Sequence, residues 1–127
     1  MGHGKTSLAE LASNPASRKW KTTDVKGNAH FISKRNEESS ASMPMHTPTK
    51  TKIYVSRHKD GNVKEISIMN PKTGKKIMEI HTAPHEGLKE HVHHWVPGKY
   101  PQNAQALTAG QRKFLEKIRD DAKTAKR

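Results

Sequence analysis

Short alternations of apolar and polar residues recur through the second half of the chain. Three pairs of apolar residues are each spaced two positions apart, as in a half-buried β-strand. The turn-forming stretches 59–62 and 70–74 separate the pairs. The pattern predicts an antiparallel meander of three strands, or of four if 90–96 adds a strand that ends at Pro97 and Gly98. The three pairs are Ile53 and Val55, Ile66 and Ile68, and Met78 and Ile80.

The C-terminal residues carry the signals of an amphipathic helix. Thr108 and Gln111 have the spacing of a capping box, in which two side chains satisfy backbone N–H groups at the helix start. An apolar stripe follows, and we expect it to pack on the sheet. The predicted fold class is therefore α+β, with a small antiparallel sheet of three to four strands, a C-terminal helix and a long irregular N-terminal segment. The stripe consists of Phe114, Leu115, Ile118 and Ala122.

The first fifty residues lack a comparable pattern. One short helical pattern spans 8–12, and Pro15 ends it. Residues 37–52 contain a serine run and two prolines, which is typical of a linker. We therefore predict two parts: residues 1–50 form an extended or partly disordered basic leader with a short helix, and residues 51–127 form the α+β domain.

The chain is strongly basic, with 24 lysine and arginine residues against 12 acidic residues and a net charge of +12. Such a chain binds polyanions because binding releases their counterions, so we predict RNA or DNA as the partner. No apolar run approaches the roughly 20 residues of a membrane-spanning helix. Cysteine is absent, which is typical of a reducing compartment. We therefore expect the protein to act in the cytoplasm.

Five of the nine histidines fall within residues 81–94. Histidine titrates near neutral pH, so two imidazoles can take a proton from an attacking hydroxyl and return one to a leaving oxygen. RNA suits this chemistry because its 2'-hydroxyl is an internal nucleophile. The density of histidines therefore predicts a nuclease, and a ribonuclease more than a deoxyribonuclease.

Strand alternation selects particular side chains. If the apolar residues of the third strand face the core, Glu79 and His81 share the opposite face as a carboxylate and imidazole pair. His91 and His93 would share one face of the next strand, with Trp95 beside them as a platform on which a base could stack. The predicted catalytic residues are His81, Glu79, His85, His91 and His93.

Cations near the strand ends are the candidates for binding phosphate. Arginine can hold a phosphate with two donors, so Arg57 is the preferred electrostatic stabiliser. Lysines at the strand ends and beyond the histidine segment complete the set. The predicted phosphate-binding residues are Arg57, Lys75, Lys76 and Lys99.

Two other interpretations of the histidines stay open. They could bind a divalent metal, and His85, His91 and His93 are then the first ligand set to test. They could also form a surface cluster without chemistry. Their spacing matches no zinc signature, so we expect no cofactor and keep a divalent metal as the alternative.

The segments His81-Thr82-Ala83-Pro84-His85 and His91-Val92-His93-His94-Trp95, on a basic sheet closed by a helix, resemble the nuclease toxin domains of bacterial competition systems. The resemblance covers about residues 50–126. It implies delivery into the cytoplasm of a susceptible target cell and cleavage there of RNA, often transfer RNA, or of DNA. It also implies an acidic immunity protein that blocks the basic face. The alternative function is a non-enzymatic nucleic-acid-binding protein associated with virions or ribonucleoproteins, in which the histidines are incidental.

Overall fold

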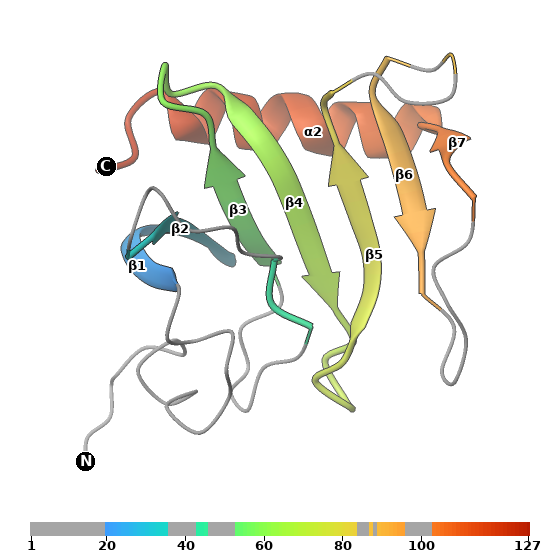
Figure 1. The fold of residues 1–127 in the computed structure, drawn as a ribbon, viewed down its shortest axis with the longest axis horizontal. Helices are drawn as coiled ribbons and strands as arrows, with labels where there is room; N and C mark the ends of the chain where they lie inside the picture. Colours follow the sequence, from blue (N-terminus) through green and yellow to red (C-terminus); the bar gives the residue numbers. More distant parts are fainter. Residues whose placement is uncertain (1–19, 36–42, 46–52, 84–86, 88, 96–102) are drawn as a thin grey trace.

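A computed structural model describes residues 20–35, 43–45, 53–83, 87, 89–95 and 103–127. These residues form one seven-stranded sheet with a single described helix lying across it (Figure 1). The strands are β1 (Trp20–Lys26), β2 (Ala29–Lys34), β3 (Ile53–Arg57), β4 (Val63–Met69), β5 (Lys76–His81), β6 (His91–His94) and β7 (Gln105–Ala106).

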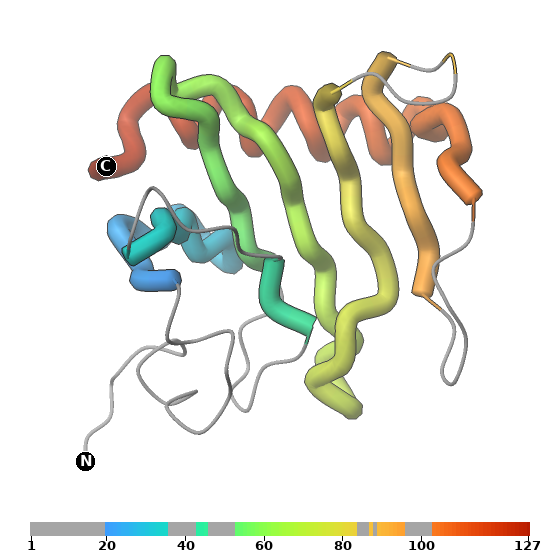
Figure 2. Tube along the Cα trace, viewed as in Figure 1, coloured from blue at the N-terminus to red at the C-terminus, as the bar shows by residue number. Residues whose placement is uncertain are grey.

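The strands follow one another across the sheet in chain order. Each neighbouring pair is antiparallel except β2 and β3, which run parallel. The C-terminal ends of β2 and β3 therefore lie side by side at the same end of their strands. The tube in Figure 2 shows β1 and β2 as a hairpin at one side and β7 at the other.

The predicted sheet of three to four antiparallel strands is wrong, because the sheet has seven strands and is mixed. The predicted irregular N-terminal segment is also wrong where β1 and β2 form a hairpin. Only Gly27 and Asn28 separate the paired residues Lys26 and Ala29, and Gly27 has a φ of 59°. A Gly-Asn pair is a known hairpin signal, but the polar residues of β1 hide the alternation around it. The helix predicted at 8–12 and the domain boundary predicted between residues 50 and 51 lie outside the described residues.

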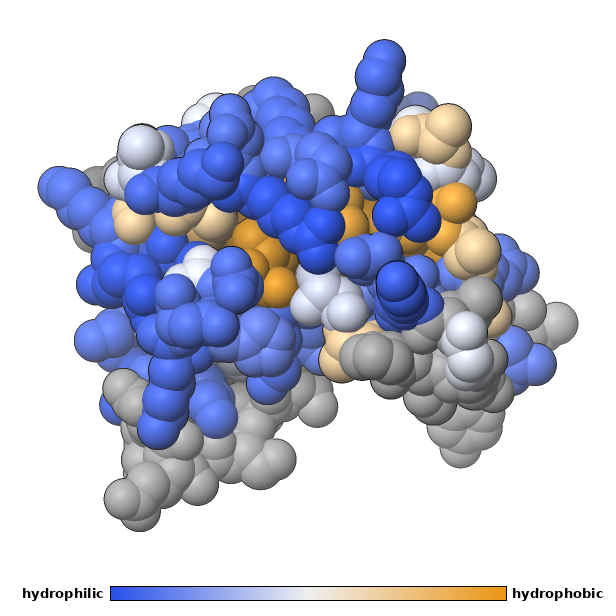
Figure 3. Space-filling view, turned by 90° about the horizontal axis from the view of Figure 1, so that it is seen from above, coloured by the Kyte–Doolittle hydropathy of each residue, from blue (hydrophilic) through white to orange (hydrophobic). Residues whose placement is uncertain are grey.

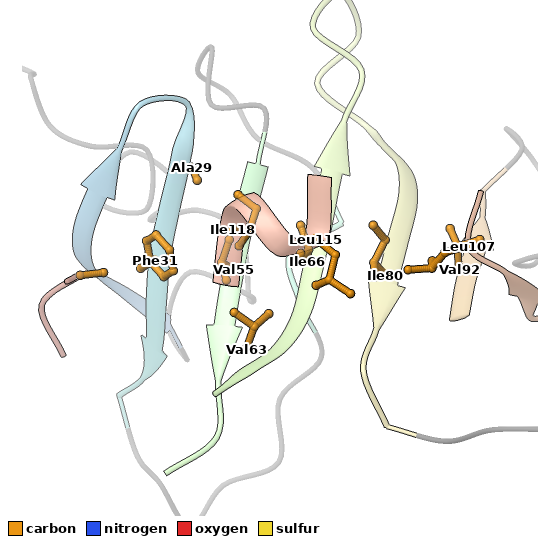
Figure 4. Close-up of a cluster of buried hydrophobic side chains, with 11 residues drawn as sticks. Ala29, Phe31, Val55, Val63, Ile66, Ile80, Val92, Leu107, Leu115 and Ile118 are labelled. Carbon is orange, nitrogen blue, oxygen red and sulfur yellow. The ribbon is translucent and has the colours of Figure 1, made fainter. Parts of the chain in front are cut away.

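The helix α2 (Ala109–Ala122) begins as predicted, with Thr108 and Gln111 forming a reciprocal capping box. Its Leu115 and Ile118 are buried against one face of the sheet. Figure 4 shows these two side chains among apolar side chains from β2 to β6. The core cluster on this face consists of Ala29, Phe31, Val55, Val63, Ile66, Ile80, Val92, Leu107, Leu115, Ile118 and Ala125.

The opposite face carries a second, smaller apolar cluster over β1 to β4. The 43–45 segment covers it, and the Met45 carbonyl accepts a hydrogen bond from the Lys76 backbone N–H at 2.8 Å. Polar side chains occupy the remainder of this face over β4 to β6. The apolar members are Trp20, Ile32, Met43, Tyr54 and Met69.

The chain end returns to the first hairpin. The Lys126 backbone N–H donates to Asp24 Oδ2 at 2.8 Å, and the Arg57 guanidinium donates to carbonyls at the end of the chain, including that of Ala125 at 3.1 Å. Seen from above, hydrophilic side chains cover most of the visible surface on either side of an apolar band (Figure 3). No helix among the described residues is long and apolar enough to cross a membrane.

Candidate functional site

The register of β4, β5 and β6 brings titratable side chains together on the face away from α2. Directly opposite residues of an antiparallel pair share a face. Ile66, Ile80 and Val92 form one such row, and all three belong to the core under α2. The rows on either side of it must therefore point the other way. Those rows are Glu65, His81 and His91, and Ser67, Glu79 and His93.

Glu79 is the buried centre of this arrangement. Its Oε2 accepts hydrogen bonds from Ser67 Oγ at 2.8 Å and from Lys76 Nζ at 2.6 Å. Its Oε1 lies 2.7 Å from His81 Nε2. Burial by itself raises the pKa of Glu79, but the bonds to His81, Lys76 and Ser67 outweigh burial and lower the pKa to about 2. Glu79 is therefore ionised at neutral pH.

His81 lies between two carboxylates. Its Nε2 faces Glu79, and its Nδ1 lies 3.2 Å from Glu65 Oε2. Burial lowers the pKa of His81, but the hydrogen bond and charge of Glu79 and the charge of Glu65 together raise it above the usual 6.5. His81 thus holds a proton more firmly than an ordinary histidine, and its side chain is 23% exposed.

Three imidazoles pack against one another here, and we call His81, His91 and His93 the imidazole cluster. His81 stacks on His91 with ring centroids 5.1 Å apart, and it meets His93 edge-on at 5.2 Å. His91 is buried, and its Nδ1 lies 3.3 Å from the Lys89 carbonyl. His93 is half-buried, with its ring 6.5 Å from that of Trp95.

The sequence-predicted residues therefore separate into groups. Glu79, His81, His91 and His93 come together, and Trp95 adjoins them. His85 and Lys99 lie outside the described residues.

The three predicted phosphate ligands that the structure describes, Arg57, Lys75 and Lys76, are not gathered at the imidazole cluster. Arg57 is bound to backbone carbonyls at the chain end and to Thr23 Oγ1, and its guanidinium lies 4.9 Å from the Phe31 ring centroid. Lys75 is exposed beside the turn before β5. Lys76 adjoins the cluster, but its side chain is 2% exposed and its charge pairs with Glu79.

Glu65 and Ser67 are site residues that sequence reasoning missed. The predicted alternation in β4 already placed Glu65 and Ser67 on the face opposite to Ile66 and Ile68. Their meeting with Glu79 and His81 depends on the register between β4 and β5, which the sequence does not state. Assigning a hairpin register to β4 and β5 would have identified Glu65 and Ser67.

Glu65, Glu79 and His81 could also hold a metal ion, since one ligand atom from each lies within 4.8 Å of the others. Carboxylate oxygens and an imidazole suit several divalent ions. Such an ion would have to replace the His81 proton and lie close to the Lys76 ammonium, which is 2.6 Å from Glu79 Oε2. A metal and a proton therefore compete for this position. His91 and His93, predicted as ligands with His85, are not members of this group.

No protein family, curated protein or solved structure matches this chain. The resemblance to nuclease toxin domains therefore stays a prediction.

Proposed function

We propose that the protein is a ribonuclease that cleaves RNA by general acid and base catalysis at His81 and His93. One observation carries the proposal: these two imidazoles, from adjacent strands, have ring centroids 5.2 Å apart beside buried Glu79. Groups at that separation can act on two oxygens of one phosphodiester. The net charge of +12 supports a polyanionic substrate.

His81 and His93 have different catalytic roles because their surroundings differ. His81 is the general acid, since two carboxylates keep it protonated. Its Nδ1 contact with Glu65 is the one that can be exchanged for substrate, because both side chains are 23% exposed. Glu79 keeps its contact with His81 Nε2 and so fixes the orientation of the His81 ring. His93 is the general base.

The reaction is then an internal transesterification. His93 takes the proton of the RNA 2'-hydroxyl, and the 2'-oxygen forms a bond to phosphorus. The bond from phosphorus to the 5'-oxygen breaks, and His81 gives that oxygen its proton. The products are a 2',3'-cyclic phosphate and a 5'-hydroxyl. His91 positions His81 by stacking, and Trp95 offers a surface for a base.

The test compares His81→Gln and His93→Gln with His94→Gln. His94 lies in the same strand as His93 but is paired with Met78, so it faces the α2 side. Loss of a general acid or base lowers the rate by about 10²- to 10⁴-fold. We expect that loss in the first two variants, cyclic-phosphate products from the parent protein, and near-parental activity in His94→Gln. Equal activity in all three variants would refute the proposal.

A metal-dependent nuclease is the second candidate, because Glu65, Glu79 and His81 offer ligand atoms within 4.8 Å of one another. Cleavage that a chelator abolishes and Mg²⁺ or Mn²⁺ restores would favour this candidate. Cleavage that survives the chelator favours the histidine mechanism. RNA binding without cleavage in either condition would favour the non-enzymatic binding protein.

The biological setting follows from the resemblance of the histidine segments to nuclease toxin domains. It supports action in the cytoplasm of a target cell and neutralisation by an acidic inhibitor protein. The net charge of +12 supports such an inhibitor independently, because an acidic protein would be attracted to the chain and block RNA access.

A further inference from the structure

A cleft of about 290 Å³ opens beside Glu65, where the C-terminal ends of β2 and β3 meet the start of β4. Its lining residues include Ser56 and Glu65, which pair across β3 and β4, so it opens on the same sheet face as the imidazole cluster. Its lining carries five positive side chains and a single carboxylate, that of Glu65. The positive residues are Lys34, Arg57, Lys59, Lys64 and Arg127.

A buried hydroxyl without a partner lies in the lining of this cleft. Ser56 is 3% exposed, and within the described part of the chain its Oγ has no hydrogen-bond partner. Buried polar groups are nearly always satisfied, and an unsatisfied one costs free energy. An anion oxygen seated in the cleft would accept a hydrogen bond from the Ser56 hydroxyl and lie among the cations.

The cleft and the proposed catalytic site share Glu65. Glu65 lines the cleft and also contacts His81 Nδ1 at 3.2 Å. Ser56, Glu65 and His81 occupy one row across three adjacent strands. Strand spacing places the ends of that row about 10 Å apart. A polymer whose scissile phosphate lies at the imidazole cluster can thus reach the cleft with a nearby phosphate.

We propose that this cleft is a phosphate-binding subsite for a flanking nucleotide of single-stranded RNA. The identity of the polymer rests on the proposed function, whereas the preference for a phosphodiester rests on the five cations and the Ser56 hydroxyl. Of the predicted phosphate ligands, Arg57 lines this subsite and contributes charge to it as one residue among several.

The first experiment measures binding without cleavage. The probe is a ten-nucleotide RNA with every 2'-hydroxyl methylated, which cannot undergo transesterification. The Lys59→Gln/Lys64→Gln variant is compared with Lys113→Gln/Lys123→Gln, which removes the same charge from exposed positions on and just after α2. We expect the cleft variant to lose about tenfold in affinity and the control less than twofold.

Salt dependence and a neutral variant sharpen the binding result. The slope of log affinity against log salt should fall by about 0.7 for each phosphate that the cleft variant no longer neutralises. Ser56→Ala should also weaken binding, although it changes no charge. Equal affinities and slopes for the cleft and control variants would overturn the subsite.

The second experiment separates the subsite from the catalytic proposal. With a cleavable ten-nucleotide RNA, KM should rise several-fold in Lys59→Gln/Lys64→Gln but not in Lys113→Gln/Lys123→Gln. If the parent protein cleaves nothing and the cleft variant still loses binding, the nuclease fails and the subsite stands. If His81-dependent cleavage occurs and both lysine variants have the same KM and affinity, the subsite fails and the nuclease stands.

Discussion

The two faces of β4, β5 and β6 use the same alternation for opposite purposes. Toward α2, Ile66, Ile80 and Val92 are at most 1% exposed and pack in the core. On the other face, the same strands present Glu79 and the imidazole cluster. Slipping one strand by a single residue would exchange its two faces. The apolar face therefore fixes the register, and the polar face depends on that register for its geometry.

The faces also differ in how they contribute to stability. Burying an aliphatic side chain under α2 contributes about 1.5–3 kcal/mol. The Lys76 and Glu79 pair gains attraction but loses hydration, so its net contribution is small while both partners are present. Removing one partner should hence be more damaging than removing both.

The largest expected effect is that of breaking this buried pair from one side. Glu79→Leu leaves the Lys76 ammonium buried without its carboxylate, which costs about 3–5 kcal/mol of unfolding free energy. Lys76→Met/Glu79→Leu should recover most of that loss. Denaturant unfolding of the parent and the three variants, with Lys76→Met included, measures the coupling. If the loss in the double variant equals the sum of the two single losses, Lys76 and Glu79 are not coupled and the contrast between the two faces fails.

A cavity under the helix is expected to have a similar or slightly smaller effect. Leu115 is fully buried, and Leu115→Ala should cost about 2–5 kcal/mol in unfolding free energy because the core cannot close the space completely. Lys113→Ala, at an exposed position of the same helix, is the control and should stay within about 0.5 kcal/mol of the parent. A loss for Leu115→Ala below about 1 kcal/mol would contradict a close-packed core under α2.

The polar face should make stability depend on pH. The pKa of Glu79 is lowered from 4.5 to about 2, so its contribution is present above pH 4.5 and is lost as pH falls toward 2. The pKa of His81 is raised from 6.5, so its contribution is present below pH 6.5 and is lost as pH rises through the higher, folded value. The contribution of the pair is therefore greatest between about pH 4.5 and 6.5.

Unfolding measurements from pH 2 to pH 9 on the parent and on Glu79→Gln/His81→Gln test this window. The stability difference between the two proteins should peak inside the window and shrink on both sides. Leu115→Ala serves as the control, because its stability difference involves no titrating group. A pH-independent difference for the polar double variant would show that these two groups do not couple to folding.

The smallest expected effect is a gain in stability. Ser56→Ala removes a buried hydroxyl without a partner, so unfolding free energy should rise by up to about 1 kcal/mol in the absence of RNA. Thermal unfolding without the methylated oligonucleotide measures this gain in stability. Thermal unfolding with the oligonucleotide measures how much less the variant is stabilised by binding it. A destabilised Ser56→Ala protein would mean that the hydroxyl has a structural partner.

The sequence predicted what depends on a single strand or helix. Alternation within β5 placed Glu79 and His81 on one face, and the spacing of Thr108 and Gln111 marked the start of α2. The hairpin of β1 and β2 escaped prediction because β1 is mostly polar and β2 buries the neighbouring Phe31 and Ile32 on opposite faces, so neither strand shows a simple alternation. The parallel pairing of β2 with β3 joins strands separated by residues 35–52, so no local pattern predicts it.

Tertiary structure alone decided the partners of each charged group. Strict alternation would put Lys76 on the α2 side with Met78, but a register shift between Ile68 and Met69 turns it toward Glu79. Glu65 reaches His81 only through the pairing of β4 with β5. Side-chain direction within a strand repeats every two residues and can be read from the sequence, whereas register and bulges depend on which strands meet and how their apolar faces pack.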